Sequence, residues 1–255
     1  MNNFQVDYYT DIGIKKKSNQ DSILLNGIEI EEQEVLLAVL CDGMGGMSKG
    51  ELASATVVRA YAEWFQKIYA NEADLQDIDK IKAQWNALIK ECNDKLIAYG
   101  RESGQQLGTT ATAVLIWSDG KYLVGHIGDT RVYYLTEEIY QITEDHTFVA
   151  REIKRGTMTK QQAATDSRRN VLLQCVGVNE SFEIQFCEGN ISKGEAFVVC
   201  SDGFRHEVTD DEILCRLRPS KLHQEKLKEK LVELVELNKQ RRESDNISVI
   251  YIKRN

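Results

Sequence analysis

Four aspartates stand at the ends of apolar segments that are typical of buried strands. Asp42 follows such a segment directly, Asp202 follows another after Ser201, and both precede a glycine, while Asp129 comes shortly after a third apolar segment. Asp245 has the opposite position, because it precedes the apolar segment Ile247 to Ile252. In antiparallel pairing the start of one strand lies beside the end of its neighbour. We therefore expect these four carboxylates to converge at one end of the sheets.

A cluster of buried carboxylates needs compensating positive charge. Unpaired anions repel one another, and burying each one costs several kcal/mol, on the order of the penalty for a desolvated ion. The neighbouring sequence offers few cations, so divalent metal ions are the economical compensation. Oxygen ligands without converging His or Cys side chains favour Mg²⁺ or Mn²⁺ over Zn²⁺. Two such ions about 3.5–4 Å apart would activate a shared water for in-line displacement at phosphorus. Gly43, which has no side chain, would let its carbonyl oxygen approach an ion closely.

Simpler interpretations of the same segments stay open. Asp-Gly is a common turn dipeptide, and Asp119-Gly120 is predicted to be only a turn. The glycine-rich stretch after Asp42 does not match a dinucleotide fingerprint, because Ser48 stands where the third glycine is required. No Gly-Lys-Ser/Thr sequence follows at P-loop spacing either. An anion-binding loop at a helix N-terminus remains an alternative for this stretch.

The elements that would position these acids are predicted from hydrophobic periodicity. Alternating or continuous apolar residues predict strands at 4–8, 22–25, 35–41, 109–117, 121–127, 132–135, 196–200 and 246–252. Apolar residues every three to four positions predict helices from about 50 to 69, 75 to 101 and 222 to 241. Residues 143 to 170 suit either two short helices or a long loop. This order favours an α+β fold with antiparallel sheets over a doubly wound fold.

Composition restricts the class of protein. The chain has 255 residues, enough to bury a sizeable core, and 40 acidic against 32 basic side chains leave a net charge of −8. This acidic balance argues against a nucleic-acid-binding protein. No apolar run approaches the roughly 18 residues of a membrane span, and no signal-peptide pattern occurs. We therefore expect a cytoplasmic protein, not associated with membranes, whose six cysteines are reduced thiols without a C-x-x-C metal pair.

Seven short motifs follow one another along nearly the whole chain. They are Asp11-Ile12-Gly13 with Ser18-Asn19-Gln20-Asp21-Ser22, Cys41-Asp42-Gly43-Met44-Gly45-Gly46, Leu107-Gly108-Thr109-Thr110, Gly128-Asp129-Thr130-Arg131, Thr143-Glu144-Asp145-His146, Cys200-Ser201-Asp202-Gly203 and Asp245-Asn246-Ile247-Ser248. Each is unspecific alone. Together, and in this order, they resemble the metal-dependent protein serine/threonine phosphatases of the 2C type (the PPM family) in their compact bacterial form.

The resemblance implies one phosphatase domain over residues 1–255. Its fold would be a central β-sandwich of two antiparallel sheets flanked by α-helices on both sides, with a flap subdomain at about residues 147–170. It implies hydrolysis of phosphoserine and phosphothreonine by water activated at a dinuclear Mn²⁺ or Mg²⁺ centre, without a phosphoenzyme intermediate. It also implies phosphoprotein substrates and a serine/threonine protein kinase as counterpart. No sequence feature suggests assembly, so we expect a monomer.

By position, the resemblance implies a role for each acidic residue of the cluster. Asp42 would bridge the two ions, and Gly43 would offer its carbonyl oxygen to the second. Asp202 and Asp245 would hold the first ion. Asp129, together with Asp202, would hold a weaker third ion that is found in bacterial relatives.

Three further positions bear on the predicted chemistry. Asp21 would lie outside the ligand shell and orient bound water. Lys16 stands where the family commonly has an arginine that grips the substrate phosphate. Lysine keeps the charge but loses the bidentate geometry, so the grip would be weaker or would shift to Lys15 or Lys17. Met44 replaces a histidine of many eukaryotic members, which would leave protonation of the leaving group to metal-bound water.

Two other functions remain alternatives at this point. A phosphatase-like fold without activity would sense or scaffold, but it would be expected to lose a ligand acid, and this chain keeps Asp42, Asp202 and Asp245. A phosphatase for small phosphate esters or nucleotides would have the same catalytic residues. Comparing turnover of phosphopeptides with turnover of nucleotides would separate these substrate classes.

Overall fold

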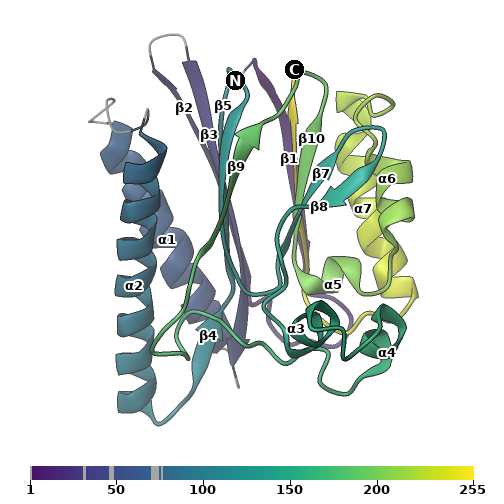
Figure 1. Cartoon of the computed structure of the whole chain (residues 1–255). Helices are drawn as coiled ribbons and strands as arrows, with labels where there is room; N and C mark the ends of the chain where they lie inside the picture. The colour runs from purple at the N-terminus through teal and green to yellow at the C-terminus, as the bar shows by residue number, and fades with distance from the viewer. Residues whose placement is uncertain (1, 31–32, 46–48, 70–74, 76) are drawn as a thin grey trace.

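Two antiparallel sheets pack face to face, and helices cover both outer faces of the sandwich (Figure 1). The computed structural model describes residues 2–30, 33–45, 49–69, 75 and 77–255, so Gly46 of the second motif lies outside the described residues. The strand order is β1-β11-β10-β7-β8 in one sheet and β2-β3-β5-β6-β9 in the other, with β4 paired to β3. The predicted α+β sandwich with antiparallel sheets is confirmed.

The strands and helices have the following bounds. The first sheet contains β1 (Phe4–Asp11), β11 (Ile247–Arg254), β10 (Ala196–Cys200), β7 (Arg131–Leu135) and β8 (Ile139–Gln141). The second contains β2 (Asp21–Ile30), β3 (Gln33–Gly45), β5 (Ala111–Trp117), β6 (Lys121–Ile127), β9 (Gln185–Asn190) and β4 (Leu107–Thr109). The helices are α1 (Lys49–Tyr69), α2 (Ile78–Ser103), α3 (Phe148–Lys154), α4 (Lys160–Thr165), α5 (Asp202–Arg205), α6 (Asp210–Leu217) and α7 (Gln224–Gln240).

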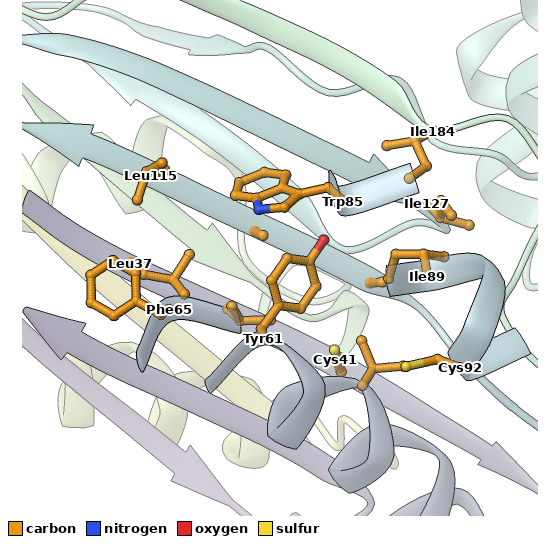
Figure 2. Packing of buried hydrophobic residues seen from close by; sticks show 14 of the residues in the cluster. Leu37, Cys41, Tyr61, Phe65, Trp85, Ile89, Cys92, Leu115, Ile127 and Ile184 are labelled. Carbon is orange, nitrogen blue, oxygen red and sulfur yellow. The ribbon is translucent and has the colours of Figure 1, made fainter. Parts of the chain in front are cut away.

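Strand β3 is buried on both faces, as its continuous apolar run predicts. Leu37 on one face joins the core beneath α1 and α2, where Tyr61 meets Trp85 edge to face with ring centroids 5.3 Å apart (Figure 2). Leu36 and Leu40 on the other face join the core between the two sheets. A third buried cluster fixes α6 and α7 on the first sheet. The strand that carries Asp42 is therefore rigidly held.

The structure corrects several element boundaries and adds elements. Helix α2 begins at Ile78 rather than at 75, because the side chain of Asp77 accepts a hydrogen bond from the Lys80 amide and caps the helix. Residues 143 to 170 contain α3 and α4, so the prediction of two short helices is confirmed and the alternative of a long loop is wrong. The short elements β4, β8, β9 and α5 were not predicted. Among the described residues, no helix combines the length and apolarity needed to cross a membrane.

The sandwich has two different ends. Both termini lie at one end, and β4, α5 and the helices α3 and α4 gather at the other, the lower end in Figure 1. Asp42 lies near the end of β3, and Asp202 begins α5 directly after β10. The predicted acids therefore belong to the same end of the sandwich.

Candidate metal centre and active site

Asp42 is held by its backbone while its carboxylate stays available. Its N–H donates to Thr110 Oγ1 (2.8 Å), and its carbonyl oxygen accepts from the Thr110 amide and from Thr109 Oγ1, each at 2.9 Å. Asp21, the first residue of β2, is its direct cross-strand partner. Like charges opposite each other destabilise a sheet, so this pairing needs compensation from a cation.

Gly43 lies at a contact between backbones that admits no side chain. A Cβ at this position would lie 2.2 Å from the Gly50 carbonyl oxygen and 2.6 Å from that of Gln20. A Cβ at Gly50 would in turn lie 2.6 Å from the Gly43 carbonyl oxygen. Both glycines are therefore required for the end of β3 to approach the start of α1.

Asn246 links the start of β11 to the segment between β1 and β2 by side-chain hydrogen bonds. Its side-chain amide donates to the carbonyl oxygens of Ile12 (2.9 Å) and Ser18 (3.1 Å), and its Oδ1 accepts from the Gln20 amide at 2.9 Å. The Asn246 carbonyl lies so close to Gly203 that a Cβ there would approach it to 2.2 Å. These contacts place Asp245, the residue before Asn246, beside the start of α5.

The five predicted aspartates interact electrostatically with one another. Burial, reinforced by the charges of Asp21, Asp202, Asp129 and Asp245, raises the pKa of Asp42 well above its usual value. Burial followed by the charges of Asp202 and Asp245 raises the pKa of Asp21 to about 7. Each carboxylate thus lies within the field of the others. The structure brings together all five predicted acids.

Several oxygens of this group have no hydrogen bond of standard geometry within the described residues. They are both carboxylate oxygens of Asp21 and Oδ1 of Asp202, all of them buried. The Ser248 and Ser201 hydroxyls lie near enough to Asp21 to oppose the rise of its pKa without reversing it. Buried oxygens without partners carry a free-energy penalty of several kcal/mol unless a cation or water satisfies them. A donor set made of carboxylates and a glycine carbonyl suits Mg²⁺ or Mn²⁺. The residues present therefore fit the divalent ions that the sequence predicts.

Lys16 lies inside this cluster. Its ammonium nitrogen is 2.6 Å from Asp245 Oδ1. Burial alone would lower the pKa of Lys16, but the hydrogen bond and charge of Asp245, with the charges of Asp42 and Asp202, raise it. Lys16 therefore supplies a positive charge at the predicted site. Its contact is with a carboxylate, and its role toward a substrate phosphate stays a prediction.

The carboxylates do not close into a ligand shell by themselves. In the part of the chain that the structure describes, no three His, Cys, Asp or Glu side chains are arranged to hold a metal ion. One oxygen of Asp245 contacts the Lys16 ammonium group.

Asp129 has a partner that the sequence analysis missed. Arg205 Nη2 lies 3.6 Å from Asp129 Oδ2 and 3.5 Å from Asp145 Oδ2, and it donates to the Asp129 carbonyl oxygen at 3.2 Å. Arg131 holds Asp145 with a bidentate pair of hydrogen bonds, from Nε to Oδ1 (2.9 Å) and from Nη2 to Oδ2 (2.8 Å). Burial raises the pKa of Asp129 to about 7, and Asp202 adds to this while Arg205 opposes it.

His206 is a second residue that the sequence analysis missed. Its Nε2 lies 3.6 Å from Asp202 Oδ2, and its Nδ1 lies 3.3 Å from Glu243 Oε2. Burial alone would lower the pKa of His206, but Glu243 and Asp202 raise it. His206 follows Asp202 by four residues, and this helical spacing is the one signal that could have indicated the contact.

Two histidines near the motifs, His126 and His146, make structural contacts. His126 is fully buried, with Nε2 3.1 Å from the carbonyl oxygens of Gly128 and Glu144 and Nδ1 2.8 Å from Thr112 Oγ1. Because carbonyls only accept, Nε2 carries the proton and Nδ1 accepts from the hydroxyl. Burial, followed by the neighbouring His146, lowers the pKa of His126 to about 3, so the ring stays neutral. His146 Nδ1 accepts from the Gly128 amide at 3.2 Å.

A two-sheet sandwich with helices on both faces, and with acids gathered at one end of its strands, is the architecture of PPM phosphatases. The chain belongs to the protein phosphatase 2C family, whose model matches residues 14–239. It is accordingly a serine/threonine protein phosphatase of the 2C type, a hydrolase. The family resemblance predicted from the motifs is thus confirmed.

Individual relatives match along nearly their whole length. A 2C-type protein phosphatase of Streptococcus pyogenes is 30% identical over 251 residues, which are 97% of this chain and 96% of that protein. The solved structure of the serine/threonine phosphatase of S. agalactiae has a TM-score of 0.86 and 29% identity, covering 99% of this chain and 100% of that one. The catalytic domain of the phosphatase PstP, solved in complex with two manganese ions, has a TM-score of 0.77 and 25% identity, covering 98% of each chain.

Proposed function

We propose that this phosphatase hydrolyses phosphoserine and phosphothreonine at a dinuclear Mn²⁺ or Mg²⁺ centre, without a phosphoenzyme intermediate. One observation carries the proposal: five aspartates from distant segments converge, and buried oxygens of Asp21 and Asp202 lack a hydrogen bond within the part of the chain that the structure describes. The two manganese ions bound to the related catalytic domain support it further.

The acidic side chains and the Gly43 carbonyl would serve as ligands for the two ions. Asp42 would contact both ions, because its backbone is fixed and its carboxylate is available. The Gly43 carbonyl would join it at one ion, and Asp202 and Asp245 would hold the other. When bound, the ions supply Lewis-acid activation of a water molecule and neutralise charge at the phosphoryl group.

The remaining residues of the site would orient water and substrate. Asp21 would accept hydrogen bonds from water through its two unpartnered oxygens. Lys16 would turn from Asp245 to the substrate phosphate when the ions neutralise that carboxylate. Asp129 would hold a third ion only weakly, because the Arg205 guanidinium already lies 3.6 Å from its carboxylate.

The test substitutes Asp42 and Asp202 with alanine and measures Mn²⁺-dependent turnover of 4-nitrophenyl phosphate, with circular dichroism to follow the fold. We expect a loss of more than about 100-fold, because removing a ligand exceeds the effect of removing an outer partner. Asp119→Ala is the matched control, since Asp119 also precedes a glycine but lies in an exposed turn. Full metal-dependent activity in D42A and D202A would refute the proposal.

The relatives' names make phosphoproteins the substrate class to test. Turnover of a phosphothreonine peptide and of a nucleotide monophosphate is compared at equal Mn²⁺ concentration. We expect the peptide to have the higher kcat/KM. A preference for the nucleotide would favour the alternative of a small-ester phosphatase with the same catalytic residues.

A further inference from the structure

A cavity of about 920 Å³ lies beneath the flap, which we define as residues 147–170 with helices α3 and α4. One side of this flap cavity is formed by the flap, and the other by the sandwich end that carries Asp145 and Arg205. Figure 1 shows α3 and α4 beside α5 at the same end of the molecule. The volume is at the upper end of the range for ligand sites, and it exceeds what a single phosphate group fills.

The flap cavity shares a wall with the acid cluster. Arg205 and His206 line the cavity, and both also contact acids of the cluster. Arg205 lies 3.6 Å from the carboxylate of Asp129, and His206 lies 3.6 Å from that of Asp202. A chain that places a phosphoresidue at the cluster can therefore extend directly into the cavity.

The lining is positively charged although the protein is acidic overall. Six basic side chains face three carboxylates in the lining, whereas the whole chain has a net charge of −8. The six are Arg131, Arg151, Lys154, Lys160, Arg169 and Arg205. A concave surface of one sign concentrates ligands of the opposite sign.

Two of these cations have no acidic partner within the described residues. Arg131 is committed to Asp145, and Lys154 lies 2.7 Å from Glu144. In contrast, no ion pair of Lys160 is found in the described ranges, and there the Arg169 guanidinium donates only to the Ala164 carbonyl oxygen, at 3.1 Å. Both side chains are exposed at the flap side of the cavity. They are available to an anionic ligand at little desolvation cost.

The geometry points to the flap cavity as the binding site for the substrate segment that flanks the phosphoresidue, with selection for segments that carry anionic side chains. The anion is a carboxylate or a second phosphate, and Lys160 and Arg169 contact it. Apolar lining from Val149, Ile153 and Leu173 accommodates the rest of the segment. This inference rests on the proposed function of the neighbouring centre.

The test uses three phosphothreonine peptides of equal length that differ only in the flanking residues, which are glutamates, glutamines or a second phosphothreonine. The variants are Arg169→Glu and Lys160→Glu. Arg155→Glu is the matched control, because Arg155 is an exposed flap arginine that does not line the cavity. The readout is the ratio of kcat/KM for each anionic peptide to that for the glutamine peptide.

We expect R169E and K160E to lower this ratio about three- to tenfold, because each variant removes an exposed cation that contacts the anion and puts a negative charge in its place. R155E leaves the ratio unchanged. The peptide with the larger wild-type ratio identifies carboxylate or phosphate as the preferred anion. Equal losses in R155E and R169E, or a wild-type ratio near one for both anionic peptides, would overturn the inference.

A binding measurement separates this inference from the proposed catalytic function. The affinity of a fluorescent, unphosphorylated glutamate-flanked peptide is measured by anisotropy, which needs no turnover. We expect R169E to weaken this binding more than R155E does. Binding with this pattern in a protein that hydrolyses no phosphate ester would refute the proposed function alone. Hydrolysis together with equal affinity in both variants would refute the flap cavity alone.

Discussion

Asp42 and Asp145 are both carboxylates at the same end of the sandwich, yet their pKa values are shifted in opposite directions. Burial and four neighbouring aspartates raise the pKa of Asp42. Burial would also raise the pKa of Asp145, but hydrogen bonds from Arg131 and the charges of Arg205 and Arg131 lower it. We call the part of the acid cluster around Asp42, where we propose the metal ions, the metal side, and the part around Asp145 the arginine side.

The difference shows two ways to stabilise buried acids. On the arginine side, the chain supplies the compensating cations itself, in fixed bidentate geometry. On the metal side, Lys16 contacts Asp245, and within the described residues no hydrogen bond of standard geometry reaches the oxygens of Asp21. The metal side therefore depends on cations from solution, which suits a site that must also bind a phosphate.

The largest expected effect is a difference in stability between substitutions on the metal side and on the arginine side, measured in protein freed of metal by EDTA. Asp145→Asn should lower the free energy of unfolding by about 3 kcal/mol, because it removes the carboxylate that Arg131 and Arg205, both largely shielded from solvent, share. Asp42→Asn should cause no loss, and a gain of up to about 1 kcal/mol, because a neutral amide replaces a carboxyl whose ionisation burial and the neighbouring aspartates oppose. Denaturant unfolding with EDTA measures both. Equal destabilisation by the two substitutions would contradict the comparison.

The pH dependence of stability gives the next effect. The pKa of Asp21 is about 7 in the folded protein and 3.8 for the free side chain, so the native state binds a proton between these values. Its contribution to stability is fully present below pH 3.8 and is lost as the pH rises through 7. In protein freed of metal by EDTA, we expect the free energy of unfolding of the wild type to rise relative to that of Asp21→Asn as the pH falls through this window. The expected rise is about 1.4 kcal/mol per pH unit. Parallel curves for the two proteins would contradict the assigned shift.

A smaller effect concerns the border between the two sides. Arg205→Met removes the guanidinium that lies beside Asp129. If that ion pair contributes roughly 1.4 kcal/mol, a third divalent ion should bind at Asp129 about tenfold more tightly in the variant. Calorimetric titration with Mn²⁺ measures this affinity, and Arg205→Lys is the conservative control. An unchanged third-site affinity in R205M would show that Arg205 does not compete with an ion.

The smallest effect is expected at Lys16. Lys16→Arg restores the forked donor, so KM for 4-nitrophenyl phosphate should fall about two- to fivefold while kcat stays nearly unchanged. Steady-state kinetics at saturating Mn²⁺ measures both constants. A higher KM would indicate that the compact ammonium, through its contact with Asp245, is the better group at this position.

The metal side could be predicted from the sequence because its signals are local. Asp42 directly follows a continuous apolar run, Asp202 follows another after one serine, and antiparallel pairing brings in Asp245. The arginine side has no local signal, since Arg205 meets Asp129 across 76 positions of the chain. Strand β9 was missed because its sequence Gln185–Asn190 is mostly polar and half exposed. Helix α5 was missed because one turn that contains a glycine shows no periodicity.

Asn246 has a consequence for when the enzyme can first become active. Its three hydrogen bonds reach Ile12, Ser18 and Gln20, across more than 220 positions of the chain. Asp245 and Asn246 immediately precede β11, which pairs with both β1 and β10. During synthesis, a nascent polypeptide that stops before β11 would have Asp42 in place but neither the fastening amide nor the last carboxylate. The proposed metal centre is thus completed only when the sandwich is completed. Chains truncated before β11 would therefore be inactive rather than active without regulation.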